Sequence, residues 1–210
     1  MMRFGATALA IAVVFGASAA LAEDVDFAAF HRICVATGGE RNAALAAAEA
    51  DGFVRPPKFV LDQVSQSAVP LDNADVRAKL IPDGVVWVSV GKMSGAFQNR
   101  YTTTDMCVLG VDPMNPASEK AAIAWGGVTP TVTDPQYQML LFTGGEGAHR
   151  AVPDAKVLDD KTVGAVASAA DLQLLGAGNT EGVTLMLYGL VKAVAAPASS
   201  ASPSQSGRSP

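Results

Sequence analysis

The sequence contains two cysteines, Cys34 and Cys107, so each can form an intramolecular disulfide only with the other. They lie much too far apart to imitate a CxxC motif, and two cysteines in an exported chain form a disulfide far more often than a metal site. In the chain-entropy model, a bridge closing a loop of roughly 70 residues stabilises a fold by about 4 kcal/mol. We therefore expect a Cys34–Cys107 disulfide, and the competing interpretation is two buried free thiols.

Residues 1–22 have the pattern of a secretory signal peptide. Arg3 supplies the positive charge, an apolar segment follows, and Ala20-Leu21-Ala22 forms a small-x-small cleavage site before Glu23. No cysteine stands at the cleavage site to carry a lipid. We expect a soluble mature chain that begins at Glu23, is periplasmic or secreted, and has no membrane span after cleavage.

Residues 26–52 predict a pair of helices. Asp24 or Asp26 can cap the first helix, and Cys34 then lies on its apolar, core-facing side. Glycines after the first helix permit the left-handed backbone that ends it, and an alanine-rich run to about residue 50 predicts the second. The N-terminal cysteine is thus expected on a helix that packs against the rest of the domain.

The rest of the chain alternates between strand and helix patterns with short hairpin links, which favour an antiparallel sheet. We therefore predict an α+β fold: an N-terminal helical pair, then a mainly antiparallel sheet with helices on one face, and one disulfide. The expected strands are 76–81, 85–91, 100–111, 136–143, 148–152, 172–177 and 183–191; the expected helices are 116–125 and 161–170; residues 58–66 fit a short helix or a strand.

Composition suggests one domain and a tail. The roughly 190 residues after the leader suffice for one domain with a substantial core. Residues 195–210 are mostly alanine, serine and proline, which bury too little apolar surface to offset the entropy of ordering. The expected organisation is a signal peptide at 1–22, a single α+β domain at 23–194, and a disordered tail at 195–210.

Charge and histidine content argue against two classes of function. The formal net charge is −5, and loss of Arg3 with the leader makes it −6 (−5 − 1), so a nucleic-acid partner is not expected. The two histidines form no H-x-x-x-H or H-E-x-x-H array, and we expect neither a metal site nor a cofactor. His31 is interpreted as a boundary residue of the first helix.

Two segments carry candidate binding residues. The glycine-rich segment 144–150 places Glu146, His149 and Arg150 close together, and its alternative interpretation is a plain hairpin turn. Arg100 and Tyr101 begin a strand whose alternate side chains project together as a recognition face, or else as an ordinary solvent face. No catalytic residue is assigned.

The motif Phe30-x-x-x-Cys34-x-x-Thr37-x-Gly39, followed by the alanine-rich helix and by Cys107-x-x-Gly110, resembles small exported proteobacterial α+β proteins of unassigned function. The resemblance covers mainly the first fifty mature residues. It implies an exported α+β domain with one disulfide, and it brings no catalytic residues.

These observations favour a non-catalytic binding or interaction protein, such as an inhibitor or immunity-type protein that occludes an envelope protein. One alternative is a small cofactor-independent hydrolase that uses the Glu146–Arg150 loop, which requires His149 to lie in a concave pocket near another polar side chain. A second alternative is a carrier of a small apolar ligand held between sheet and helices. Oligomeric state is left open.

Overall fold

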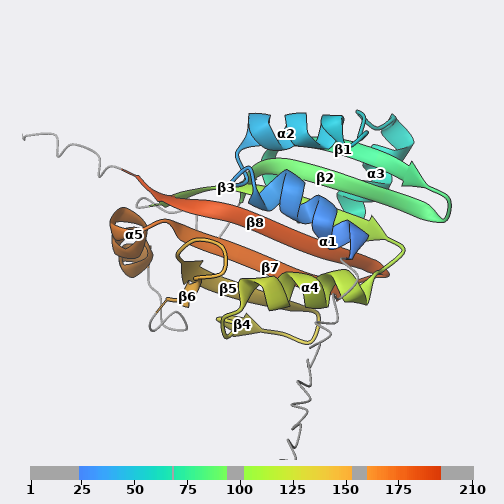
Figure 1. Cartoon of the computed structure of the whole chain (residues 1–210). Helices are drawn as coiled ribbons and strands as arrows, with labels where there is room; N and C mark the ends of the chain where they lie inside the picture. The colour runs from blue at the N-terminus through green and yellow to red at the C-terminus, as the bar shows by residue number, and fades with distance from the viewer. Residues whose placement is uncertain (1–23, 68, 94–101, 153–159, 195–210) are drawn as a thin grey trace, which may run out of the picture.

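The computed structural model describes residues 24–67, 69–93, 102–152 and 160–194, and within them the fold is α+β with one antiparallel sheet (Figure 1). The expected leader, the expected tail, and the candidates Arg100 and Tyr101 lie outside the described residues. The helices are α1 (Val25–Phe30), a π-helical turn η1 (His31–Val35), α2 (Arg41–Ala50), α3 (Lys58–Ser67), α4 (Pro116–Gly126) and α5 (Asp160–Ala169). The strands are β1 (Leu71–Ile81), β2 (Gly84–Met93), β3 (Thr102–Asp112), β4 (Val132–Thr133), β5 (Tyr137–Thr143), β6 (Arg150–Ala151), β7 (Leu172–Thr180) and β8 (Val183–Ala193).

The sheet is antiparallel throughout, in the order β1-β2-β3-β8-β7-β5-β4, with β6 paired to β5. Most neighbouring strands of the sheet are also neighbours in sequence, and the exceptions are β5 with β7 and β3 with β8. The pairing of β3 with β8 joins the two halves of the sheet, from Thr102 opposite Ala193 to Val111 opposite Thr184. The C-terminal strand therefore lies in the middle of the sheet, beside the strand that carries Cys107 (Figure 1).

Helices pack on both faces of this sheet, so the expectation of a single helical face is wrong. Residues of α1, η1, α2 and α4 pack with Val88 of β2, whereas α3 packs with the neighbouring Trp87. Val163 of α5 packs with Met106, which alternates with Cys107 along β3. Successive strand residues point to opposite faces of the sheet, and these strands carry apolar side chains on both faces. Each face is therefore buried by packing helices against it.

The expected disulfide is confirmed. Cys34 of η1 and Cys107 of β3 are bonded, with their Cα atoms 5.3 Å apart and both side chains fully buried. The chain then turns through Gly38 and Gly39, which have φ values of 65° and 70°. A Cβ at Gly39 would lie 3.0 Å from the backbone oxygen of Tyr188, so only glycine allows this segment so close to β8.

Side-chain caps fix α1 against α4. Of the two aspartates that could cap α1, Asp24 does so: its Oδ1 accepts from the backbone N–H groups of Asp26 and Phe27, at 3.2 and 2.9 Å. The same oxygen accepts from the Ser118 hydroxyl at 2.6 Å. Asn115 caps α4 by accepting from the backbone N–H of Ala117, and its side-chain amide donates to Asp24 and Asp26, so the two helices are joined at their first turns.

Residues 58–66, which fit either a helix or a strand, lie within the helix α3. The two-residue strand β4 was not expected, because its sequence is rich in threonine and proline and reads as a loop. Among the described helices, none combines the length and the apolar character needed to cross a membrane.

Candidate functional site

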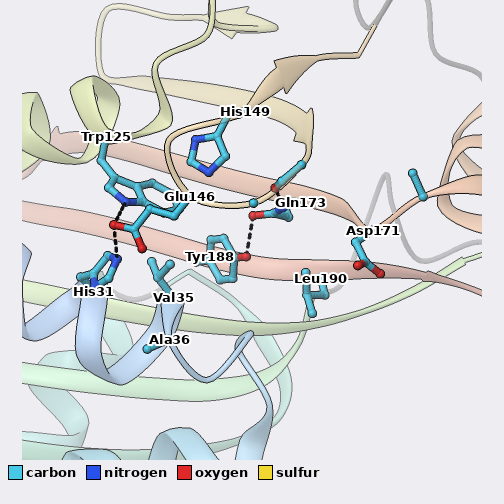
Figure 2. Close-up of a pocket in the computed structure, with 13 residues that line it drawn as sticks. His31, Val35, Ala36, Trp125, Glu146, His149, Asp171, Gln173, Tyr188 and Leu190 are labelled. Carbon is cyan, nitrogen blue, oxygen red and sulfur yellow. Dashed lines mark hydrogen bonds and ion pairs between the residues drawn. The ribbon is translucent and has the colours of Figure 1, made fainter.

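A pocket of about 610 Å³ lies on the face of the sheet that carries α1, η1 and α4. Its sides come from η1, the last turn of α4, the loop after β5 and the turn before β7, and its floor comes from β7 and β8 (Figure 2). Because η1 is bonded to β3 by the disulfide, one wall of the pocket is fixed covalently to the sheet.

Trp125 is the centre of an aromatic wall. Its ring centroid lies 4.6 Å from that of His149, 5.6 Å from that of His31 and 6.3 Å from that of Tyr188, each in an edge-to-face arrangement. Behind it, Phe142 closes the cluster at 6.1 Å. Rings in this geometry attract one another beyond their burial, so the wall is held in a defined shape.

The two histidines support this wall and keep their Nε2 atoms away from the open space. His149 Nδ1 lies 3.0 Å from the backbone oxygen of Gly126 and acts as the donor there, since a carbonyl oxygen can only accept. The Nε2 atoms of His31 and His149 are both buried and have no hydrogen-bond partner among the described residues. Neither atom is presented to a molecule in the pocket.

Glu146 joins the glycine-rich loop to the wall. Its side chain is 67% exposed, yet Oε1 accepts from Trp125 Nε1–H at 3.4 Å and lies 3.5 Å from His31 Nε2 (Figure 2). One oxygen thus bridges α4 and η1, and the carboxylate remains open to the pocket and to solvent.

Tyr188 and Gln173 form the floor. The Tyr188 hydroxyl donates to Gln173 Oε1 at 2.8 Å, and Gln173 Nε2 donates to the backbone oxygen of Gly144 at 2.5 Å. Burial, and secondarily the negative charge of Asp171, raise the pKa of Tyr188 to about 12, so its phenol stays neutral at physiological pH. Asp171 also lines the pocket and is exposed.

The structure brings together only part of the predicted site. Glu146 and His149 line the pocket, whereas Arg150 lies exposed in β6 and does not. His31 is half-buried at a helix boundary, as interpreted from sequence, but it also lines the pocket. Four further lining residues were not predicted from sequence: Trp125, Asp171, Gln173 and Tyr188. The signal for Trp125 was its place beside two glycines at a helix end.

Two other kinds of site have less support. Within the described ranges, no group of three or more His, Cys, Asp or Glu side chains could hold a metal ion. A second cavity of about 300 Å³, lined largely by apolar residues such as Met139, Leu185 and Leu187, lies on the opposite face of the sheet. It borders Val69 and Met93, which adjoin residues outside the described ranges, so no binding site is assigned to it.

The pocket at Trp125 is therefore the feature on which a functional conclusion depends. Comparison with models of protein families, with curated proteins and with solved structures found no match for the chain.

Proposed function

We propose that this protein is an exported, non-catalytic binding protein whose ligand occupies the pocket at Trp125. The observation that carries the proposal is the pocket itself, about 610 Å³, with an aromatic wall and a hydrogen-bonded floor. Binding sites for small molecules usually have volumes of about 300–1,000 Å³ and combine apolar walls with a few fixed polar groups. The Cys34–Cys107 disulfide is compatible with an oxidising compartment outside the cytoplasm.

Catalysis at this pocket has less support than the binding of a ligand. The described residues that line it include no serine, threonine or cysteine that could serve as a nucleophile. A histidine base must reach the proton that it removes, and the Nε2 atoms of His31 and His149 are buried instead. The side chains that face the open space are suited to hold a molecule.

The hydrolase alternative keeps one supporting observation. His149 lies in a concave pocket beside the polar side chain of Glu146, which is the arrangement that the alternative required. Its imidazole would have to turn so that Nε2 faces a substrate. The alternative therefore predicts hydrolysis of a model ester panel that is lost in His149→Gln, and absence of turnover by the wild type would contradict it.

Isolation of the protein from the cells that produce it tests the binding proposal. Native mass spectrometry should detect a non-covalent small molecule on the wild type. Gly145 lines the pocket, has no left-handed φ, and a Cβ there would meet nothing within 4 Å, so a larger side chain can enter the open space without backbone strain. Gly145→Phe should therefore lose the bound molecule, whereas the matched control Gly145→Ala should retain it.

Absence of any bound molecule on the wild type, or its retention by Gly145→Phe, would contradict the proposal. The inhibitor or immunity-type role is a narrower version in which the ligand is a segment of an envelope protein. In that case the retained mass is a polypeptide, and Gly145→Phe should release it in the same way.

A further inference from the structure

We infer that the pocket takes an organic cation, and that the ligand class it fits best is an aliphatic diamine or polyamine. This inference rests on the proposed function and specifies its ligand. It follows from three properties of the lining residues: their charge, their unused hydrogen-bonding capacity and their arrangement around Tyr188.

The charged side chains that line the pocket are both carboxylates. Glu146 and Asp171 are exposed at its rim, and no lysine or arginine is among the described lining residues. Asp171 acts at the floor as well, because its negative charge contributes to the raised pKa of Tyr188. A cation is attracted into such a site and an anion is repelled from it.

Three side chains at the pocket already donate hydrogen bonds within the protein. Trp125 Nε1–H donates to Glu146, the Tyr188 hydroxyl donates to Gln173, and Gln173 donates to the backbone oxygen of Gly144. The carboxylate oxygens of Glu146 and Asp171 have further lone pairs that can accept. A ligand that brings donors suits these oxygens, and an ammonium group brings three donors and no acceptor.

The walls suit the aliphatic and cationic parts of such a molecule. Trp125 and Tyr188 are aromatic, and a cation near an aromatic ring is attracted by its quadrupole. In Figure 2, Glu146 and Asp171 lie on either side of Tyr188, with the apolar side chains of Val35 and Leu190 at the lower edge. Two amino groups joined by a methylene chain match two carboxylates that lie on either side of an aromatic ring.

Calorimetric titration with matched probes tests this inference. The probes are α,ω-diamines, dicarboxylates and diols with four to eight carbons, added at pH 8, where a histidine side chain is ordinarily neutral. One diamine should bind with a stoichiometry of one, while the dicarboxylate and the diol of the same length should not. Added salt should weaken the binding, because these carboxylates are exposed to solvent.

Isosteric variants identify the site. Glu146→Gln and Asp171→Asn should each weaken diamine binding about two- to fivefold, the range that exposed ion pairs give. Gly145→Phe should abolish it. Glu181→Gln is the matched control, because it removes one exposed carboxylate at the turn between β7 and β8, away from the pocket lining, and should leave the affinity unchanged.

Three results would overturn the inference: no diamine binds, a dicarboxylate or a diol binds as tightly as the diamine, or Glu181→Gln weakens binding as much as the pocket variants do. These failures differ from a failure of the proposed function. If the wild type carries a bound molecule that Gly145→Phe loses, the pocket is a binding site, and only its assignment to cations is wrong.

Discussion

Cys34 and Cys107, 73 residues apart, are bonded to each other with neither side chain exposed to solvent. The bond lies within the core cluster between η1 and the sheet, directly behind the segment that contributes His31 and Val35 to the pocket. The disulfide bond that stabilises the fold therefore also positions one wall of the candidate site.

Removing the Cys34–Cys107 disulfide should destabilise the protein strongly. For a loop of 73 residues the chain-entropy model gives about 4 kcal/mol, a large share of a domain's usual stability. Cys34→Ala/Cys107→Ala should therefore unfold at a much lower denaturant concentration than the oxidised wild type, and reduced wild type should behave similarly. Free energies of unfolding that differ by less than about 1 kcal/mol would show that the bridge contributes little.

Replacing Asp24 should cost about 1–3 kcal/mol, because it removes the cap of α1 and leaves the buried Ser118 hydroxyl without its acceptor. Burial opposes ionisation of Asp24, but hydrogen bonds from Ser118, Phe27, Asn115 and Asp26 hold its pKa below the usual range. The stability from the ionised carboxylate is thus fully present above the unfolded-state pKa of about 3.9, and is lost as pH falls through the lower folded-state pKa.

Urea unfolding of Asp24→Ala and wild type at several pH values measures this effect. The difference between them should be largest at neutral pH and shrink below about pH 4. Glu181→Gln serves as the control and should follow the wild type throughout. A difference that is constant down to pH 2 would contradict the linkage.

Two glycine substitutions should have opposite outcomes. A Cβ at Gly110 would lie 2.2 Å from the ring of Trp87, which is 1% exposed, so Gly110→Ala must displace a buried side chain. Overpacking of this kind costs about 1–3 kcal/mol. Gly145→Ala adds the same methyl group to open space and should change stability by less than about 0.5 kcal/mol. Equal stability of the two variants would contradict the packing described for Trp87.

The sequence predicted most local structure, because local signals fix it. The strands expected at 76–81 and 85–91 and the helix expected at 116–125 correspond to β1, β2 and α4, and local signals bound them: Pro82-Asp83-Gly84 at the turn and Asn115 before Pro116. The cysteine pairing was predictable because each cysteine had one possible partner. The face of the sheet that each helix covers was not predictable, since apolar residues on both sides of a strand do not show which helix packs on which side.

The candidate site was predicted only in part, because it depends on contacts between distant segments. Trp125 meets His31 across 94 positions (125 − 31) and Tyr188 across 63 (188 − 125). The central pairing of β3 with β8 brings these segments together, and no turn signal marks it. Glu146 and His149 were found because they lie close together in one glycine-rich loop.

Tyr188 should ionise at a higher pH than a tyrosine exposed to water. Its pKa is raised to about 12, so the stability from the neutral phenol is fully present below the unfolded-state pKa of about 10 and is lost as pH rises toward 12. Ultraviolet titration of the folded protein should show one late component, which Tyr188→Phe removes. If Tyr188→Phe instead removes a component near pH 10 while the far-ultraviolet signal of both proteins remains native, the buried floor of the pocket is wrong.

The two tryptophans allow the most direct test of the pocket as a binding site. Trp125 lies in the pocket and donates its indole N–H to Glu146, whereas Trp87 is buried on the opposite face of the sheet. In proton–nitrogen spectra recorded as the tightest-binding diamine is added, the indole signal of Trp125, assigned with Trp125→Phe, should move to saturation while that of Trp87 stays in place. An unmoved Trp125 signal at saturating diamine, or an equal shift of both tryptophans, would contradict the account.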